Sequence, residues 1–231
     1  MLGKDKGDIL GGNESILDLV KVLPKEFSDV VETGTFLGDT TRKFSEVMHW
    51  VHTIELDERL YEYTKSRLIE EGSRNISCYL GNSAEVLPII IKDYNDNHPA
   101  KKVIFFLDAH WSGDESITEY KNGYSGPHTW IGNFTGHLGN GDNPSSKEQI
   151  PLEEEIMHIY DNFQNECMIV IDDLDKFDEN GVGMAGLCFD EEDWSCVNLK
   201  SVVKSIEARI VHPIKEYKDR LIIRLKGKNE I

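Results

Sequence analysis

The sequence predicts an α/β fold built on a mainly parallel sheet of seven strands. Short apolar runs alternate along the chain with stretches that repeat apolar residues at helical spacing, the pattern of parallel strands joined by helices. The last two apolar runs are separated only by residues 214–219. Because that connection is too short for a helical crossover, we expect a C-terminal antiparallel hairpin.

Strands are expected where apolar runs are bounded by turn-forming residues, at 29–32, 50–55, 76–80, 103–108, 168–172, 209–213 and 220–225. Helices are expected where apolar residues recur every three or four positions, at 14–23, 39–48, 57–71, 83–93, 150–163 and 197–208. The first helix should cover one face of the sheet. Residues 111–149, after the fourth strand, are rich in Gly, Asn, Ser and Pro with interspersed aromatic residues, which favours a lid insertion over a disordered loop.

Length and charge limit the possible functions. We expect a single domain over residues 1–231. The net charge of −17 repels phosphate, so nucleic acid and anionic membranes are not expected as partners. No apolar run is long enough to span a membrane and the start lacks a signal-peptide pattern, so we expect a cytoplasmic protein. Its four scattered cysteines should be reduced and mostly packed, and its oligomeric state stays open.

The first strand runs into a turn with two glycines, Gly34 and Gly38, and then into a helix. Glycines there let the backbone turn sharply and approach a ligand closely, with helix N–H groups available for its polar part. An ordinary strand-to-helix turn is the alternative. The G-x-x-x-G spacing differs from the G-x-G-x-x-G of dinucleotide sites, which disfavours NAD.

Polar residues also follow the second and third strands. Glu55 lies where a carboxylate can accept both hydroxyls of a ribose, whereas Asp57 is expected to cap the next helix. Asn82 and Ser83 follow the third strand, where they could meet the edge of an adenine. Ser83 could equally be a helix cap, and both interpretations stay open.

These residues together resemble the class I S-adenosylmethionine-dependent methyltransferases over about residues 20–225. The resemblance implies a Rossmann-like, doubly wound sheet with a terminal hairpin. It also implies that Glu32 holds the amino group of the methionine moiety, that Gly34 and Gly38 make room for the cofactor, and that Glu55 holds the ribose hydroxyls. The full set of expected cofactor-binding residues is Glu32, Gly34, Thr35, Gly38, Thr40, Glu55, Asn82, Ser83 and Asp108.

Two further apolar strands end in carboxylates. Asp108 ends one, and Asp172 and Asp173 end the other. Since parallel strands open on one edge of a sheet, the three side chains can converge, and their mutual repulsion favours a divalent cation. Oxygen ligands suit Mg²⁺, or else Mn²⁺ or Ca²⁺. The alternative is that Asp172 or Asp173 merely caps a turn.

This arrangement resembles the metal-dependent, macrocin-type sugar O-methyltransferases, whose corresponding strands end in Asp-Gly-Asp and Asp-Asp. The resemblance implies that Asp108, Asp172 and Asp173 hold the metal. The last position of Asp-x-Asp, the general base in that family, is His110 here. An imidazole is a competent base near neutral pH, although a neutral hydrogen-bonding role for His110 is the alternative.

The resulting hypothesis is an S-adenosylmethionine-dependent O-methyltransferase that modifies a hydroxyl of a sugar or glycan, with Mg²⁺, Asp108 and His110 in catalysis. A catechol-type or other small-molecule O-methyltransferase is the main alternative. A nicotinamide-dependent oxidoreductase and a non-catalytic cofactor-binding module are disfavoured. The carboxylates of Glu153, Glu154 and Glu155 are expected in solvent at a helix start. Trp194 could border the acceptor pocket or pack a loop onto the sheet.

Overall fold

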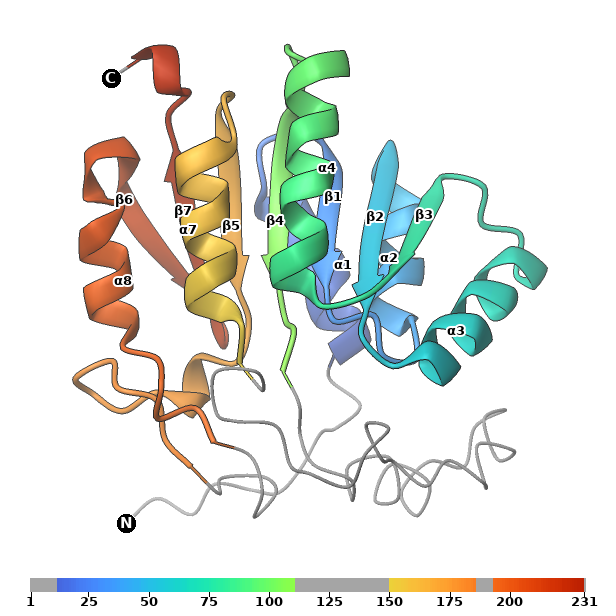
Figure 1. Cartoon of the computed structure of the whole chain (residues 1–231), viewed down its shortest axis with the longest axis horizontal. Coiled ribbons are helices and arrows are strands. Elements are labelled where there is room, and N and C mark those ends of the chain that lie inside the picture. Colours follow the sequence, from blue (N-terminus) through green and yellow to red (C-terminus); the bar gives the residue numbers. More distant parts are fainter. Residues whose placement is uncertain (1–11, 111–149, 186–192, 231) are drawn as a thin grey trace.

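The computed structural model describes residues 12–110, 150–185 and 193–230. Its sheet has the strand order β3-β2-β1-β4-β5-β7-β6 (Figure 1). The strands are β1 (Phe27–Thr33), β2 (Trp50–Glu55), β3 (Ile76–Leu80), β4 (Lys102–Leu107), β5 (Cys167–Ile171), β6 (Ile210–Tyr217) and β7 (Arg220–Leu225). Strands β1 to β5 pair in parallel, and β7 pairs antiparallel with both β5 and β6. The predicted fold class, including its terminal hairpin, is confirmed.

Helices cover both faces of this sheet. The described helices are α1 (Gly12–Val22), α2 (Asp39–Val47), α3 (Glu58–Glu70), α4 (Ser83–Asn97), α7 (Leu152–Asn162) and α8 (Leu199–Ser205). The helices α4, α7 and α8 lie in front of the sheet in Figure 1, and α1 and α2 lie behind it. Short 3-10 turns occupy Leu174–Lys176, Glu207–Arg209 and Lys228–Glu230.

The core explains why the central strands read as continuous apolar runs. In β4, Phe105 packs in the cluster shared with α4 and α7, while Phe106 packs in the cluster shared with α1 and α2. Both side chains are fully buried. In α1, Ile16 and Leu19 join the second cluster, so the predicted cover of one face by the first helix is confirmed. A strand covered on both faces gains from apolar residues at every position.

The hairpin differs from its predicted bounds. Residues 214–217, expected in a loop, belong to β6, and the connection to β7 is only Lys218 and Asp219. Lys218 has φ 58°, the left-handed conformation of a tight turn. The prediction was wrong because β6 is an outer strand with exposed polar residues, which hides its apolar pattern. The last predicted helix is also shorter, since α8 ends at Ser205.

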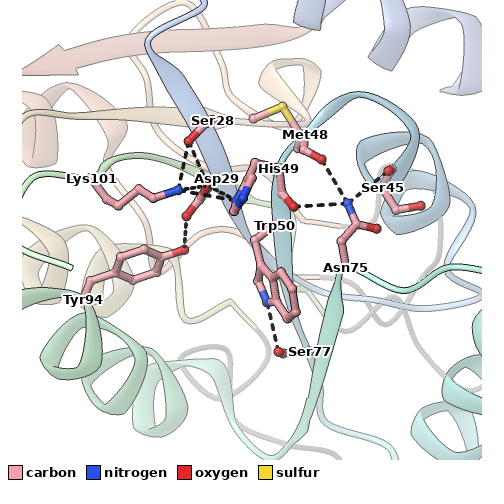
Figure 2. Close-up of polar contacts among 10 residues, drawn as sticks. All are labelled: Ser28, Asp29, Ser45, Met48, His49, Trp50, Asn75, Ser77, Tyr94 and Lys101. Atoms are coloured by element: carbon pink, nitrogen blue, oxygen red, sulfur yellow. Dashed lines mark hydrogen bonds and ion pairs between the residues drawn. The ribbon is translucent and has the colours of Figure 1, made fainter. Parts of the chain in front are cut away.

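The amino edge of the sheet, where β1, β2 and β4 begin, is closed by a polar network (Figure 2). Asp29 lies at its centre and is 4% exposed. Its carboxylate accepts hydrogen bonds from Lys101 Nζ at 3.0 Å, Ser28 Oγ at 2.8 Å and Tyr94 Oη at 3.3 Å. The ring of His49 lies 3.3 Å away. Burial raises the pKa of Asp29, but these contacts outweigh it and hold the pKa below its usual value.

Among the described helices, none is long and apolar enough to cross a membrane. Cys167 is buried, Cys78 and Cys196 are half-buried, and Cys188 lies outside the described residues. The predicted lid, residues 111–149, also lies outside them.

Candidate cofactor and metal site

The predicted site residues lie along the opposite, carboxyl edge of the sheet. The strand register pairs Thr33 at the end of β1 with Ile54 and with Leu107, and Leu107 with Ile171. The ends of β2, β1, β4 and β5 are therefore successive neighbours, and they share one edge of the sheet, as the sequence predicted for parallel strands. The predicted polar residues lie at these ends, at the end of β3, or in the turns and first helical residues that follow them.

The glycine turn after β1 is present as the sequence predicts, but its two glycines make close contacts with different parts of the chain. Gly34 has φ +83°, and a Cβ there would lie 2.6 Å from the carbonyl oxygen of Asp108. Gly38 has φ +79°, and a Cβ there would lie 2.4 Å from Cγ2 of Thr64 in α3. Gly34 thus lets the turn approach the end of β4, whereas Gly38 lets α3 pack against the start of α2.

Glu32 is fully buried below this turn. Its Oε2 accepts hydrogen bonds from Thr41 Oγ1 at 2.5 Å and Thr53 Oγ1 at 2.7 Å. Its Oε1 has no hydrogen-bond partner within the described part of the chain. Burial raises the pKa of Glu32 to about 7, although the two hydroxyls lower it. A buried carboxylate oxygen without a donor is costly, which fits a site that a ligand cation completes.

Glu55 binds the neighbouring backbone. Its Oε2 accepts from the N–H of Phe36 at 2.7 Å and its Oε1 from the N–H of Asp57 at 2.9 Å. Burial raises its pKa to about 6. Asp57 itself caps α3 by accepting from the N–H groups of Arg59 and Leu60, as predicted. Each oxygen of Glu55 keeps a second lone pair that can accept a ribose hydroxyl.

The remaining predicted cofactor residues lie in the turn after β1 and at the starts of α2 and α4. Thr35 is buried and its Oγ1 lies 2.6 Å from that of Thr53. Thr40 is half-buried in the first turn of α2. Asn82 caps α4 through the N–H of Ala84, so the alternative of Ser83 as the cap was wrong by one residue. Ser83 is the first residue of α4 and is buried.

Two leucines that the sequence analysis did not single out lie beside these residues. Leu80 pairs in register with Glu55, and Leu56 follows Glu55 directly. Leu80 is 42% exposed and Leu56 is 45% exposed. Exposed apolar side chains at adjacent strand ends provide a surface for a planar ring. For Leu56, the signal in the sequence is its position directly after Glu55, the last residue of β2, whereas Leu80 is itself the last residue of β3.

The three predicted metal ligands are brought to one place but are not equivalent. Asp172 Oδ2 accepts from Arg220 Nη2 at 3.0 Å, and its Oδ1 accepts from the N–H of Asp173 at 3.1 Å. Asp108 has no such donor on its carboxylate among the described residues, and its one ion-pair contact there is the imidazole of His110 at 3.8 Å. Burial and the charges of Asp172 and Asp173 raise the pKa of Asp108 well above its ordinary value.

His110 lies between two of these carboxylates. Its Nδ1 is 3.8 Å from Asp108 Oδ1 and 3.6 Å from Asp173 Oδ2. One potential ligand atom from each of these three residues lies within 4.8 Å of the other two. Ligands of an octahedral ion at about 2.1 Å lie roughly 3 to 4 Å apart, so small side-chain rotations would let the three enclose a divalent cation. The donor set fits such an ion.

Two further residues had no predicted role here. Arg220, at the start of β7, is buried and supplies the positive charge beside Asp172. A single arginine at the start of an apolar strand was the available signal. Glu155 is fully buried, with Thr33 and Ser83 as neighbours, whereas Glu153 and Glu154 are exposed. The prediction that all three carboxylates lie in solvent was therefore wrong for Glu155.

Trp194, whose role the sequence left open, is 3% exposed and belongs to the core cluster of α4, α7 and α8. Its ring lies 5.6 Å from that of Phe177 and 5.3 Å from that of His110. Gly183 packs so closely that a Cβ there would lie 1.8 Å from the carbonyl oxygen of Trp194. Trp194 thus packs its loop onto the sheet and also supports the imidazole of His110.

No family model matches the chain, and no curated protein sequence matches it. Solved structures do. The PH0226 protein from Pyrococcus horikoshii OT3 is similar with a TM-score of 0.53 and 10% identity, over 97% of this chain and 93% of that one. The SAH-bound methyltransferase PaMTH1 from Podospora anserina has a TM-score of 0.50 and 11% identity, over 96% and 80%. At this identity the likeness shows the fold: the chain has a Rossmann-like fold shared with a methyltransferase.

Proposed function

We propose that the chain is an S-adenosylmethionine-dependent O-methyltransferase whose acceptor is a hydroxyl of a sugar or glycan. One observation carries the cofactor assignment: the buried Glu32 carboxylate keeps one oxygen without a donor among the described residues, beside the Gly34 turn. The ammonium group of a methionine moiety would complete it through a charge-assisted hydrogen bond. The fold shared with an SAH-bound methyltransferase supports the same assignment.

The other edge residues supply the rest of a nucleoside site. Glu55 would accept the ribose hydroxyls with the lone pairs that Phe36 and Asp57 leave available. The exposed side chains of Leu56 and Leu80 would contact the face of the adenine, and Asn82 and Ser83 lie beyond them at the start of α4. These positions follow the strand ends from β1 to β3, so the cofactor would lie along the edge of the sheet.

The topology disfavours the nicotinamide alternative. A dinucleotide-binding sheet typically has the parallel order 3-2-1-4-5-6. Here β7 is inserted antiparallel between β5 and β6. The G-x-x-x-G turn also lacks the close glycine pair that brings a backbone against a pyrophosphate.

Methyl transfer to a hydroxyl forms an oxygen–carbon bond while the methyl–sulfur bond breaks and sulfur keeps the electron pair. A divalent cation bound near Asp108, Asp172 and Asp173 would lower the pKa of the acceptor hydroxyl and fix its direction. The chain itself must orient the acceptor beside the cofactor, and alignment alone can lower the barrier by about 7 kcal/mol or more. His110 has two possible roles at this point: it can accept the hydroxyl proton or hold the cation.

The test is transfer of a labelled methyl group from S-adenosylmethionine to a panel of monosaccharides, glycans and catechols, with divalent cations or with EDTA. Transfer to a sugar hydroxyl supports the proposal. Transfer to catechols alone would replace the acceptor with a planar phenol. Binding of NAD in place of S-adenosylmethionine would contradict the cofactor assignment.

A further inference from the structure

We propose that the cation is held by Asp108, His110 and Asp173, with Asp172 excluded by Arg220, and that the site therefore selects a transition-metal ion over Mg²⁺ and Ca²⁺. This inference deepens the proposed function and depends on it only for what the ion is used for. The residues that hold the ion differ from the three carboxylates that the sequence indicated, and His110 becomes a ligand in place of a base.

The partners of each carboxylate indicate which aspartates can bind the cation. Asp172 is paired with Arg220 Nη2 at 3.0 Å, and this positive charge disfavours a second cation at the same carboxylate. The guanidinium of Arg220 is buried, with 5% of its side chain exposed, so pulling Asp172 away would leave a buried positive charge. No described residue donates a hydrogen bond to the Asp108 carboxylate, whose charged neighbours in this part of the chain include the imidazole of His110 and the carboxylates of Asp172 and Asp173.

The position of His110 supplies the third donor. Its Nδ1 faces a carboxylate oxygen from the end of β4 and another from the turn after β5, and the three atoms lie within 4.8 Å of one another. The indole of Trp194, itself buried by Phe177, packs against the imidazole and limits its rotation. This contact favours the ring orientation in which Nδ1 lies near the two carboxylates.

The donor chemistry determines the class of ion. Mg²⁺ and Ca²⁺ are bound in proteins almost entirely by oxygen, whereas an imidazole nitrogen favours first-row transition ions. Two carboxylates and one imidazole therefore suit Mn²⁺, Fe²⁺, Co²⁺ or Zn²⁺. An imidazole bound through its lone pair cannot accept a proton from the acceptor, so the ligand and base roles of His110 exclude each other. The proton of the acceptor hydroxyl would then pass to solvent water, because a divalent cation lowers the pKa of a bound hydroxyl.

The test measures binding of Mn²⁺ alone to the purified full chain. The loss of the free-ion signal in electron paramagnetic resonance reports the amount of bound ion. Spin-echo modulation by a directly bound ¹⁴N nucleus reports whether an imidazole is coordinated. We expect this modulation in the wild type, and we expect excess Mg²⁺ to displace Mn²⁺ poorly. The variant His110→Asp should keep Mn²⁺, lose the nitrogen modulation and let Mg²⁺ compete better.

Two carboxylate variants complete the design. Asp173→Asn should weaken Mn²⁺ binding at least about tenfold, the smaller of the usual losses around metal sites. Asp172→Asn is the matched neighbour and can still accept a hydrogen bond from Arg220, so it should change Mn²⁺ affinity by less than about threefold. Thermal shifts with S-adenosylhomocysteine in EDTA establish that each variant is folded.

The opposite pattern overturns the inference: if Asp172→Asn loses Mn²⁺ while wild type shows no nitrogen modulation, three carboxylates hold the ion and His110 is left as the base. Absence of Mn²⁺ binding in a wild-type sample that binds S-adenosylhomocysteine would also overturn it, while leaving the proposed cofactor and methyl transfer standing. Failure to bind the cofactor with intact Mn²⁺ binding would contradict the proposed function alone.

Discussion

Carboxylates lie at both edges of the same sheet, in opposite electrostatic environments. At the amino edge, Asp29 is surrounded by Lys101, His49 and two hydroxyl donors, and its pKa is lowered (Figure 2). At the carboxyl edge, Asp108 is surrounded by other carboxylates, and its pKa is raised. The first arrangement is complete within the protein. The second is a cost to folding that a bound cation and a cationic cofactor would relieve.

Asp173→Ala should have the largest effect on function. It removes a carboxylate from the ion site, so we expect turnover to fall by at least about a thousandfold, since a catalytic cation supplies several kcal/mol. Affinity for S-adenosylmethionine should change by less than about threefold. Single-turnover kinetics and calorimetric binding separate the two effects. An equal loss of cofactor affinity would place Asp173 in the cofactor site.

Glu32→Gln should weaken S-adenosylmethionine binding about 10- to 100-fold, the range expected for a lost charged hydrogen bond. In the wild type, affinity should rise as the pH rises through about 7, because the cofactor ammonium prefers the ionised carboxylate. The variant should lose this pH dependence. Titration calorimetry between pH 6 and pH 8 measures both, and a variant that keeps wild-type affinity would remove Glu32 from the site.

Asp29→Asn tests how much the polar network at the amino edge stabilises the fold. It should destabilise the fold by about 1 to 3 kcal/mol at pH 7, because it weakens hydrogen bonds to a buried charge. Since the folded-state pKa is lowered, the contribution of Asp29 is present above about pH 4 and is lost as the pH falls through the folded pKa. Urea unfolding at pH 3 and pH 7 should therefore show a smaller difference between variant and wild type at pH 3. Cofactor and metal affinities should not change.

Glu155→Gln should have the opposite effect on stability and stabilise the fold above neutral pH. Burial raises the pKa of Glu155 from 4.5 to about 7, so the wild type should lose stability as the pH rises between these values. We expect the variant to be more stable at pH 8, by up to about 3 kcal/mol, and nearly neutral at pH 4. Glu154→Gln, an exposed neighbour, is the control and should be neutral at both. A destabilised Glu155→Gln at pH 8 would show that the ionised carboxylate has a partner.

The strands that position the site could be predicted because their pattern is local. The runs that became β4 and β5 are apolar at nearly every position, since helices cover both of their faces, and their polar ends identify Asp108 and Asp172 directly. The outer strand β6 was predicted too short because its exposed positions are polar. Glycine spacing predicted the turn, but not that Gly38 accommodates Thr64 of α3.

The division of roles among the carboxylates could not be predicted, because it depends on tertiary contacts. Arg220 lies 48 residues from Asp172 in sequence, and nothing local marks the two as partners. Glu155 follows two exposed glutamates on the same helix, and only the packing of α7 against the sheet buries it. For such residues the sequence identifies a charged group near an edge, while its environment determines its function.

The central claim is that this edge holds S-adenosylmethionine, and a thermal melt of the full chain tests it most directly. Ligand at about 100 times its dissociation constant adds roughly 2.7 kcal/mol of stability, which is readily measured. We predict that S-adenosylmethionine and S-adenosylhomocysteine raise the melting temperature of the wild type, that NAD does not, and that Glu32→Gln reduces the shift. Stabilisation by NAD alone, or no shift with either methionine-derived ligand, would contradict the account.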